Sequence, residues 1–170
     1  MPDPKAGDLI LVRSPYWYSA AIRAGQWIAG DRDYNARNHA SIVRYDDGTQ
    51  VESLSQGPTQ THVEKYRDMP YTVIREPYTG EELARGEEFL RSDLENRAGY
   101  DWLAIAGALP YVLSGGRVML ASAGSNYICS ALAAEYKVRT KNAYFLDRHA
   151  VFQWPSSLAR KYGAKDSEYE

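Results

Sequence analysis

The sequence predicts a single α+β domain in which an antiparallel sheet packs against helices. The chain has 170 residues, enough for one domain with a core of its own. β-rich stretches bounded by turn residues occupy its first half, and helical patterns dominate the second half. There is no repeat, linker or low-complexity block. We therefore assign residues 1–164 to one domain and expect the charged residues 165–170 to form a disordered tail.

Apolar or β-branched residues between turn residues predict the strands. The predicted strands are residues 8–13, 39–45, 49–54 and 71–75. Residues 46–48, Asp-Asp-Gly, are typical of a hairpin between the second and third of these strands. Residues 56–58, Gln-Gly-Pro, end the third strand, and the stretch around His62 is expected to be a polar loop.

Apolar residues at helical spacing, together with capping residues, predict the helices. Thr79 and Glu82 have the spacing of a capping box, so a helix should follow them to about residue 97. Ser125 or Asn126 can cap a helix that runs to about residue 139, and Pro155 suits the first turn of a last short helix. Two further helices are expected, at residues 16–29 and 101–113.

Composition excludes several classes of partner. Twenty Lys and Arg residues stand against 22 Asp and Glu residues, and the absence of a basic run argues against a nucleic-acid partner. The longest apolar run, residues 102–113, contains a proline and is too short for a transmembrane segment. The N-terminus lacks the pattern of a secretory signal, and one cysteine cannot form an internal disulfide. We expect a soluble, cytoplasmic protein, with export by another route as the alternative.

Cys129 is the candidate nucleophile. It falls in or just past the first turn of its predicted helix, where unpaired backbone N–H groups and the helix dipole favour a thiolate. It also begins a stripe at helical spacing that should face the sheet: Cys129, Leu132, Ala133 and Tyr136. The alternative is that Cys129 is a small buried residue of the core.

His39 is the candidate base, because it opens a predicted strand. The other histidines, His62 and His149, stand in polar surroundings and are expected to be solvated. A surface position is the alternative for His39 as well. The spacing of the histidines and Cys129 does not match a metal site, so we expect neither a metal nor a cofactor.

Several short segments resemble the circularly permuted NlpC-type papain-like hydrolases, the YiiX-like proteins, which are distantly similar to lecithin retinol acyltransferase. The matching segments are residues 7–10, 38–43, 51–52, 99–101, 127–132 and 155–159. They keep the order of the family, and Tyr-Ile-Cys-Ser at 127–130 is the most specific. The permuted group has the histidine before the cysteine, as here. The resemblance implies a papain-like fold, with Cys129 as nucleophile at a helix N-terminus and His39 as base.

The resemblance also implies a polar residue that orients the histidine from the next strand, and Glu52 occupies the matching position. A tight turn at Asp47 and Gly48 would pair residue 43 with Glu52 and place His39 opposite Gln56. Glu52 would then lie about 13 Å along the strand from His39. Glu52 can orient His39 only if the turn is longer or shifted, and Gln56 is the alternative. A solvent-facing position is the structural alternative for Glu52.

The function implied by this resemblance is a cysteine hydrolase that forms an acyl-enzyme. An amidase or peptidase acting on cell-wall peptide or an isopeptide-like bond is the leading hypothesis. Lipid acyl transfer or thioester hydrolysis is one alternative, and a non-catalytic binding or assembly module on the same fold is another. The partner would be a peptide, amide or acyl substrate. The backbone N–H of Cys129 would stabilise the oxyanion, with Tyr16, Tyr18 or Tyr127 as a candidate second donor.

Overall fold

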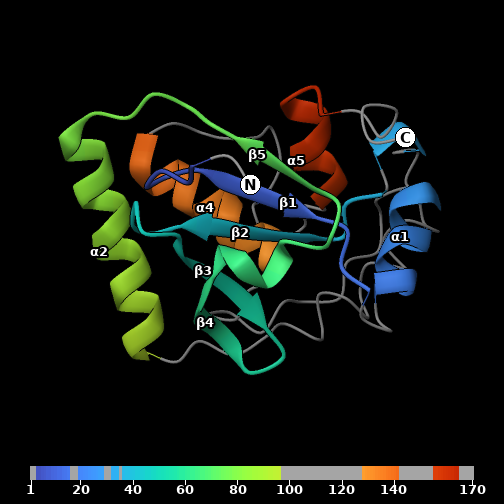
Figure 1. Ribbon diagram of the computed structural model, residues 1–170, viewed down its shortest axis with the longest axis horizontal. Coiled ribbons are helices and arrows are strands. Elements are labelled where there is room, and N and C mark those ends of the chain that lie inside the picture. The colour runs from blue at the N-terminus through green and yellow to red at the C-terminus, as the bar shows by residue number, and fades with distance from the viewer. Residues whose placement is uncertain are drawn as a thin grey trace, which may run out of the picture.

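A five-stranded antiparallel sheet lies at the centre of the protein (Figure 1). The computed structural model describes residues 3–15, 19–28, 32–34, 36–96, 128–141 and 155–164. The strands are β1 (Leu9–Val12), β2 (His39–Val43), β3 (Thr49–Leu54), β4 (Gly57–His62) and β5 (Tyr71–Ile74). Their order across the sheet is β4-β3-β2-β1-β5. The prediction of an α+β domain with an antiparallel sheet is confirmed.

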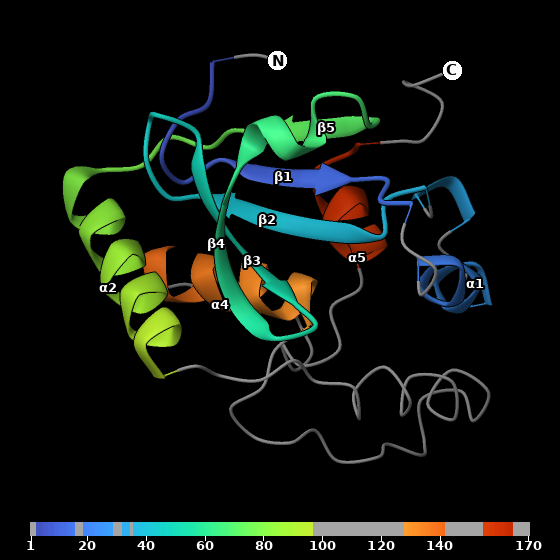
Figure 2. The ribbon, with the colours of Figure 1, turned by 60° about the horizontal axis from the view of Figure 1, so that its bottom comes forward.

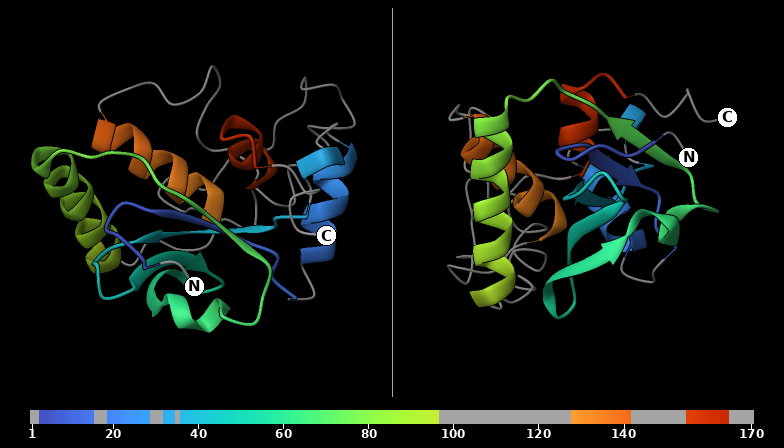
Figure 3. Two further views of the ribbon diagram at one scale, coloured as in Figure 1. Left: turned by 45° about the horizontal axis from the view of Figure 1, so that its top comes forward. Right: turned by 60° about the vertical axis from the view of Figure 1, so that its left-hand side comes forward.

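Four α-helices and two short 3₁₀ helices accompany the sheet in the described ranges. They are α1 (Ser19–Ile28), α2 (Gly80–Asn96), α4 (Cys129–Lys141), α5 (Pro155–Lys161), η1 (Arg32–Tyr34) and η2 (Val63–Tyr66). Figures 2 and 3 show α4 and α5 on one side of β1 and β2, and η2, the short green helix between β4 and β5, on the other. None of the helices in these ranges is long and apolar enough to cross a membrane.

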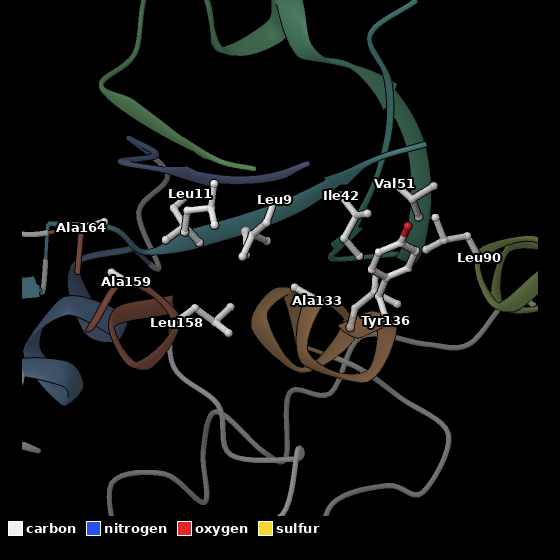
Figure 4. Packing of buried hydrophobic residues seen from close by; sticks show 13 residues of the cluster. Leu9, Leu11, Ile42, Val51, Leu90, Ala133, Tyr136, Leu158, Ala159 and Ala164 are labelled. Carbon is white, nitrogen blue, oxygen red and sulfur yellow. The ribbon is translucent and has the colours of Figure 1, made fainter. Parts of the chain in front are cut away.

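The main core lies between the sheet and the helices. Figure 4 shows leucine, isoleucine and valine side chains of β1, β2 and β3 directed toward α2, α4 and α5. Leu132, Ala133 and Tyr136 belong to this cluster, so these three residues of the stripe predicted for α4 face the sheet. On the opposite face Ile10 and Val12 pack with residues of η2. Because β1 is covered on both faces, its sequence is continuously apolar rather than alternating.

The capping box predicted before α2 is present. The Glu82 backbone N–H donates to Thr79 Oγ1 at 3.2 Å, and the Thr79 N–H donates to Glu82 Oε2 at 2.7 Å. Both donors would otherwise have no acceptor inside the helix. The beginning of α2 is therefore determined by these two residues.

The expectation of a polar loop after residue 58 was wrong. The chain turns through Ser55 and Gln56 and continues as β4, which pairs with β3 from Leu54↔Gly57 to Thr49↔His62. This edge strand is rich in threonine and glutamine and has no apolar face, so hydrophobic periodicity does not reveal it. The helix expected at 101–113, the caps at Ser125 or Asn126 and the tail at 165–170 lie outside the described residues.

The loop between β2 and β3 sets the pairing register. Val43 pairs with Gln50, and Ser41 pairs with Glu52. The Arg44 backbone N–H donates to the Thr49 carbonyl, so four residues, 45–48, form the loop. This loop is longer than the tight two-residue turn, and Gly48 adopts a left-handed φ of 90° within it.

Candidate active site

His39 is held at the start of β2 by its neighbour Asn38. The Ser14 N–H donates to Asn38 Oδ1 at 2.9 Å, and Asn38 Nδ2 donates to the Ser14 carbonyl at 3.0 Å. These bonds join the segment after β1 to the entry of β2. The His39 side chain is buried, with 4% of the residue exposed. The hydrogen bonds between Asn38 and Ser14 therefore fix the backbone next to His39 and help to position its ring.

Glu52 is the direct partner of the His39 ring. Because Glu52 pairs with Ser41, it lies on the same face of the sheet as His39 and two residues along the strand. Diagonal neighbours of this kind are about 7–8 Å apart, within reach of a glutamate side chain. His39 Nε2 and Glu52 Oε2 are 2.6 Å apart. The structure thus has the longer loop that Glu52 needs in order to contact His39.

Four side chains converge on the fully buried Glu52 carboxylate. Oε1 accepts hydrogen bonds from Thr61 at 2.5 Å and from Lys65 at 2.9 Å. Oε2 accepts from His39 and from the hydroxyl of Tyr66. A carboxylate has about four acceptor positions, and these donors use all of them. Glu52 is consequently suited to orient the imidazole and unsuited to bind a further group.

Cys129 is the first residue of α4 and is buried, with 3% exposed. Two turns further along the helix, buried Lys137 donates to Glu76 at 2.8 Å and to the hydroxyl of Tyr78. These bonds attach α4 to the segment that follows β5. The position of Cys129 therefore depends on the apolar stripe and on a polar anchor in the same helix.

Cys129 and the carboxylate of Glu52 both raise the pKa of the same imidazole. Burial is the largest influence on His39 and lowers its pKa, but nearby Cys129, with the hydrogen bond and charge of Glu52, outweighs it and raises the pKa to about 9. Burial likewise disfavours ionised Glu52, yet the hydrogen bond and charge of His39, with Thr61 and Tyr66, lower its pKa to about 2. At neutral pH His39 is thus an imidazolium beside an ionised carboxylate.

The other candidate residues are not at this place. Gln56 lies exposed in the turn between β3 and β4, where its side-chain oxygen accepts from Ser55. His62 is exposed, and its Nε2 donates to the Asp47 carbonyl at 2.8 Å. His149 and the tyrosines proposed as oxyanion donors, Tyr16, Tyr18 and Tyr127, lie outside the described residues. Within the described ranges, acidic, histidine and cysteine side chains do not form a group that could hold a metal ion.

Sequence reasoning missed the three residues that complete the surroundings of Glu52. Thr61 lies on the edge strand β4, and Lys65 and Tyr66 lie in η2 immediately after it. Their role depends on the β3–β4 pairing, which the hydrophobic pattern does not indicate. Thr59 and Thr61 are two residues apart, as residues on one face of a strand are. This spacing is the feature of the sequence that could have indicated β4.

Comparison with known proteins identifies no relative: no family model matches the chain, and neither does any curated protein.

Proposed function

We propose that the protein is a cysteine hydrolase in which Cys129 is the nucleophile, His39 the general acid and base, and Glu52 the residue that orients His39. The observation that supports this most directly is the position of His39. Its ring is hydrogen-bonded to Glu52 at 2.6 Å, and Cys129 is close enough to raise the pKa of the same ring. The sequence resemblance to permuted NlpC-type hydrolases supports the same roles.

The chemistry follows from these roles. The Cys129 thiolate attacks a carbonyl carbon, so that an S–C bond forms and the carbonyl oxygen becomes an oxyanion. The His39 imidazolium gives its proton to the leaving amine as the C–N bond breaks, which leaves a thioester. Neutral His39 then takes a proton from water while the water oxygen bonds to the thioester carbon. Breakage of the C–S bond releases the acid and restores the thiolate beside a protonated His39.

The helix position of Cys129 suits the charge that develops in the first step. The backbone N–H groups of a first helical turn have no acceptor within the helix. Cys129 is the first residue of α4, so its own N–H can donate to an oxyanion on the carbon that its sulfur attacks. An amide or peptide bond is the proposed substrate, because a protonated imidazole is the group that a poor amine leaving group requires.

Alkylation of the native protein tests this function. Cys129 is the sole cysteine, so the mass added by iodoacetamide reports on it alone. At pH 6 the wild type should be labelled at least 10-fold faster than the His39→Gln variant, since an ordinary thiol is largely protonated there. The His62→Gln variant is the matched control and should react as the wild type does. Labelling that requires denaturant, or that is equally fast without His39, would show that the thiol is part of the core.

A further inference from the structure

Lys65 shares the charge of Glu52 with His39. Its ammonium lies 2.9 Å from Oε1, while His39 lies 2.6 Å from Oε2 of the same buried carboxylate. The Lys65 side chain is 27% exposed, so its charge reaches the site from the solvent side. One negative charge therefore faces two cationic partners. The stabilisation that Glu52 offers to protonated His39 is smaller than it would be without Lys65.

The charged, titratable and hydrogen-bonding groups around His39 and Glu52 come from α4, β2, β3, β4 and η2. Three groups face His39: Cys129 of α4, Glu52 of β3 and the ring of Tyr66 in η2. The ring centroids of Tyr66 and His39 are 6.0 Å apart. His39 of β2, Thr61 of β4, and Lys65 and Tyr66 of η2 face Glu52. Lys65 is the one cation among these groups that is not itself part of the proposed reaction.

The proposed second half-reaction makes this arrangement important. Once Cys129 is acylated, the thiolate charge that stabilises the imidazolium is gone. Burial, which favours the neutral ring, then competes with Glu52, which favours the protonated one. Water can be activated only by neutral His39. The strength of the Glu52 charge therefore decides how readily the acyl-enzyme obtains its base.

We propose that Lys65 is a positioning residue that acts through Glu52: by sharing the carboxylate's charge, it allows His39 to release its proton near neutral pH during deacylation. This inference rests on the proposed function. The Tyr66 and Thr61 hydroxyls hold the same carboxylate without adding a charge, so they fix its orientation and leave the charge balance to Lys65.

The test is an NMR titration of the His39 ring nitrogens in the full chain. It is made on the free protein and on protein alkylated at Cys129 with iodoacetamide, whose neutral thioether imitates the acylated sulfur. In both forms Lys65→Met should raise the pKa of His39 by about one unit, because a cation close to the carboxylate is lost. Lys65→Arg keeps the charge and should leave the titration unchanged.

Arg67→Met is the matched control, because Arg67 is an exposed cation of the same region that pairs with Glu64 rather than with Glu52. It should move the His39 titration by less than about 0.2 units, since exposed charges are well screened. An unchanged or lowered His39 pKa in a folded Lys65→Met protein would overturn the inference. Lys65→Gln repeats the test if the methionine variant does not fold.

The two proposals fail in different ways. If Cys129 does not react in the native protein but Lys65→Met still raises the His39 pKa, the proposed hydrolase is wrong and the charge sharing remains. If Cys129 is reactive and the Lys65 variants leave His39 unchanged, the hydrolase stands and the role of Lys65 is refuted.

Discussion

Replacing Glu52 by glutamine should make the protein less stable in a manner that depends on pH. The variant keeps the shape of the side chain but removes the charge that His39 and Lys65 share. A carboxyl group whose pKa falls from 4.5 to about 2 on folding contributes about 3–4 kcal/mol, at about 1.4 kcal/mol per pKa unit. Loss of one partner from a buried ion pair typically costs a similar amount, about 3–5 kcal/mol.

The sign of the pH dependence follows from the lowered pKa. The contribution of ionised Glu52 is fully present above the unfolded pKa of 4.5 and is lost as the pH falls toward 2. The free energy of unfolding of the wild type should therefore exceed that of Glu52→Gln by about 3–4 kcal/mol at pH 6, and the difference should shrink steadily below pH 4.5. His39 remains protonated over this interval in the wild type.

Urea unfolding followed by tryptophan fluorescence from pH 6 to pH 3 measures both free energies. Glu64→Gln is the control, because Glu64 is an exposed carboxylate of η2 paired with Arg67, the residue directly after that helix. Its effect should stay within about 1 kcal/mol at every pH. A difference between wild type and Glu52→Gln that is below about 1 kcal/mol at pH 6, or that does not change down to pH 3, would refute the account of Glu52 as a buried, ionised group.

Three further predictions have defined outcomes. Thr79→Ala should lower the free energy of unfolding in urea by about 1 kcal/mol through loss of the capping box, and Thr79→Ser should retain most of it. Gly86→Ala should cost about 1–3 kcal/mol in the same assay, because its Cβ would lie 2.6 Å from a tyrosine ring of α4, whereas Gly80→Ala meets open space and should be tolerated. Glu52→Asp keeps the charge but withdraws it by about 1.5 Å. The NMR titration should then show a lower pKa for His39, and an unchanged titration would mean that reach is unimportant.

Elements defined by local patterns could be predicted from the sequence. β3 has the predicted bounds, and α2 begins where the reciprocal bonds of Thr79 and Glu82 place it. The stripe of α4 faces the sheet because helical periodicity and burial agree. In each case the determining interactions join residues close together in the sequence, or depend only on which face is apolar.

The surroundings of Glu52 could not be predicted in this way. Lys65 and Tyr66 reach Glu52 only because β4 returns alongside β3, and β4 is a polar edge strand without an apolar face. Pairing at such an edge is decided by backbone hydrogen bonds and by the turn at Ser55 and Gln56, not by hydrophobic burial. The three donors Thr61, Lys65 and Tyr66 are therefore brought to the Glu52 carboxylate by tertiary structure alone.

Whether Glu52 contacts His39 depends on two things: the face of the sheet on which each side chain lies, and the length of the loop between β2 and β3. The observed register differs from that of a tight turn by two residues, and a two-residue shift leaves every side chain on its original face. Glu52 therefore shares a face with His39 in either register, but its distance along the strand falls from about 13 Å to about 7 Å. The four-residue loop produces this change. Gly48 permits that loop through its left-handed backbone, and a Cβ there would also lie 2.9 Å from His62. A residue outside the site thus decides whether the carboxylate reaches the imidazole.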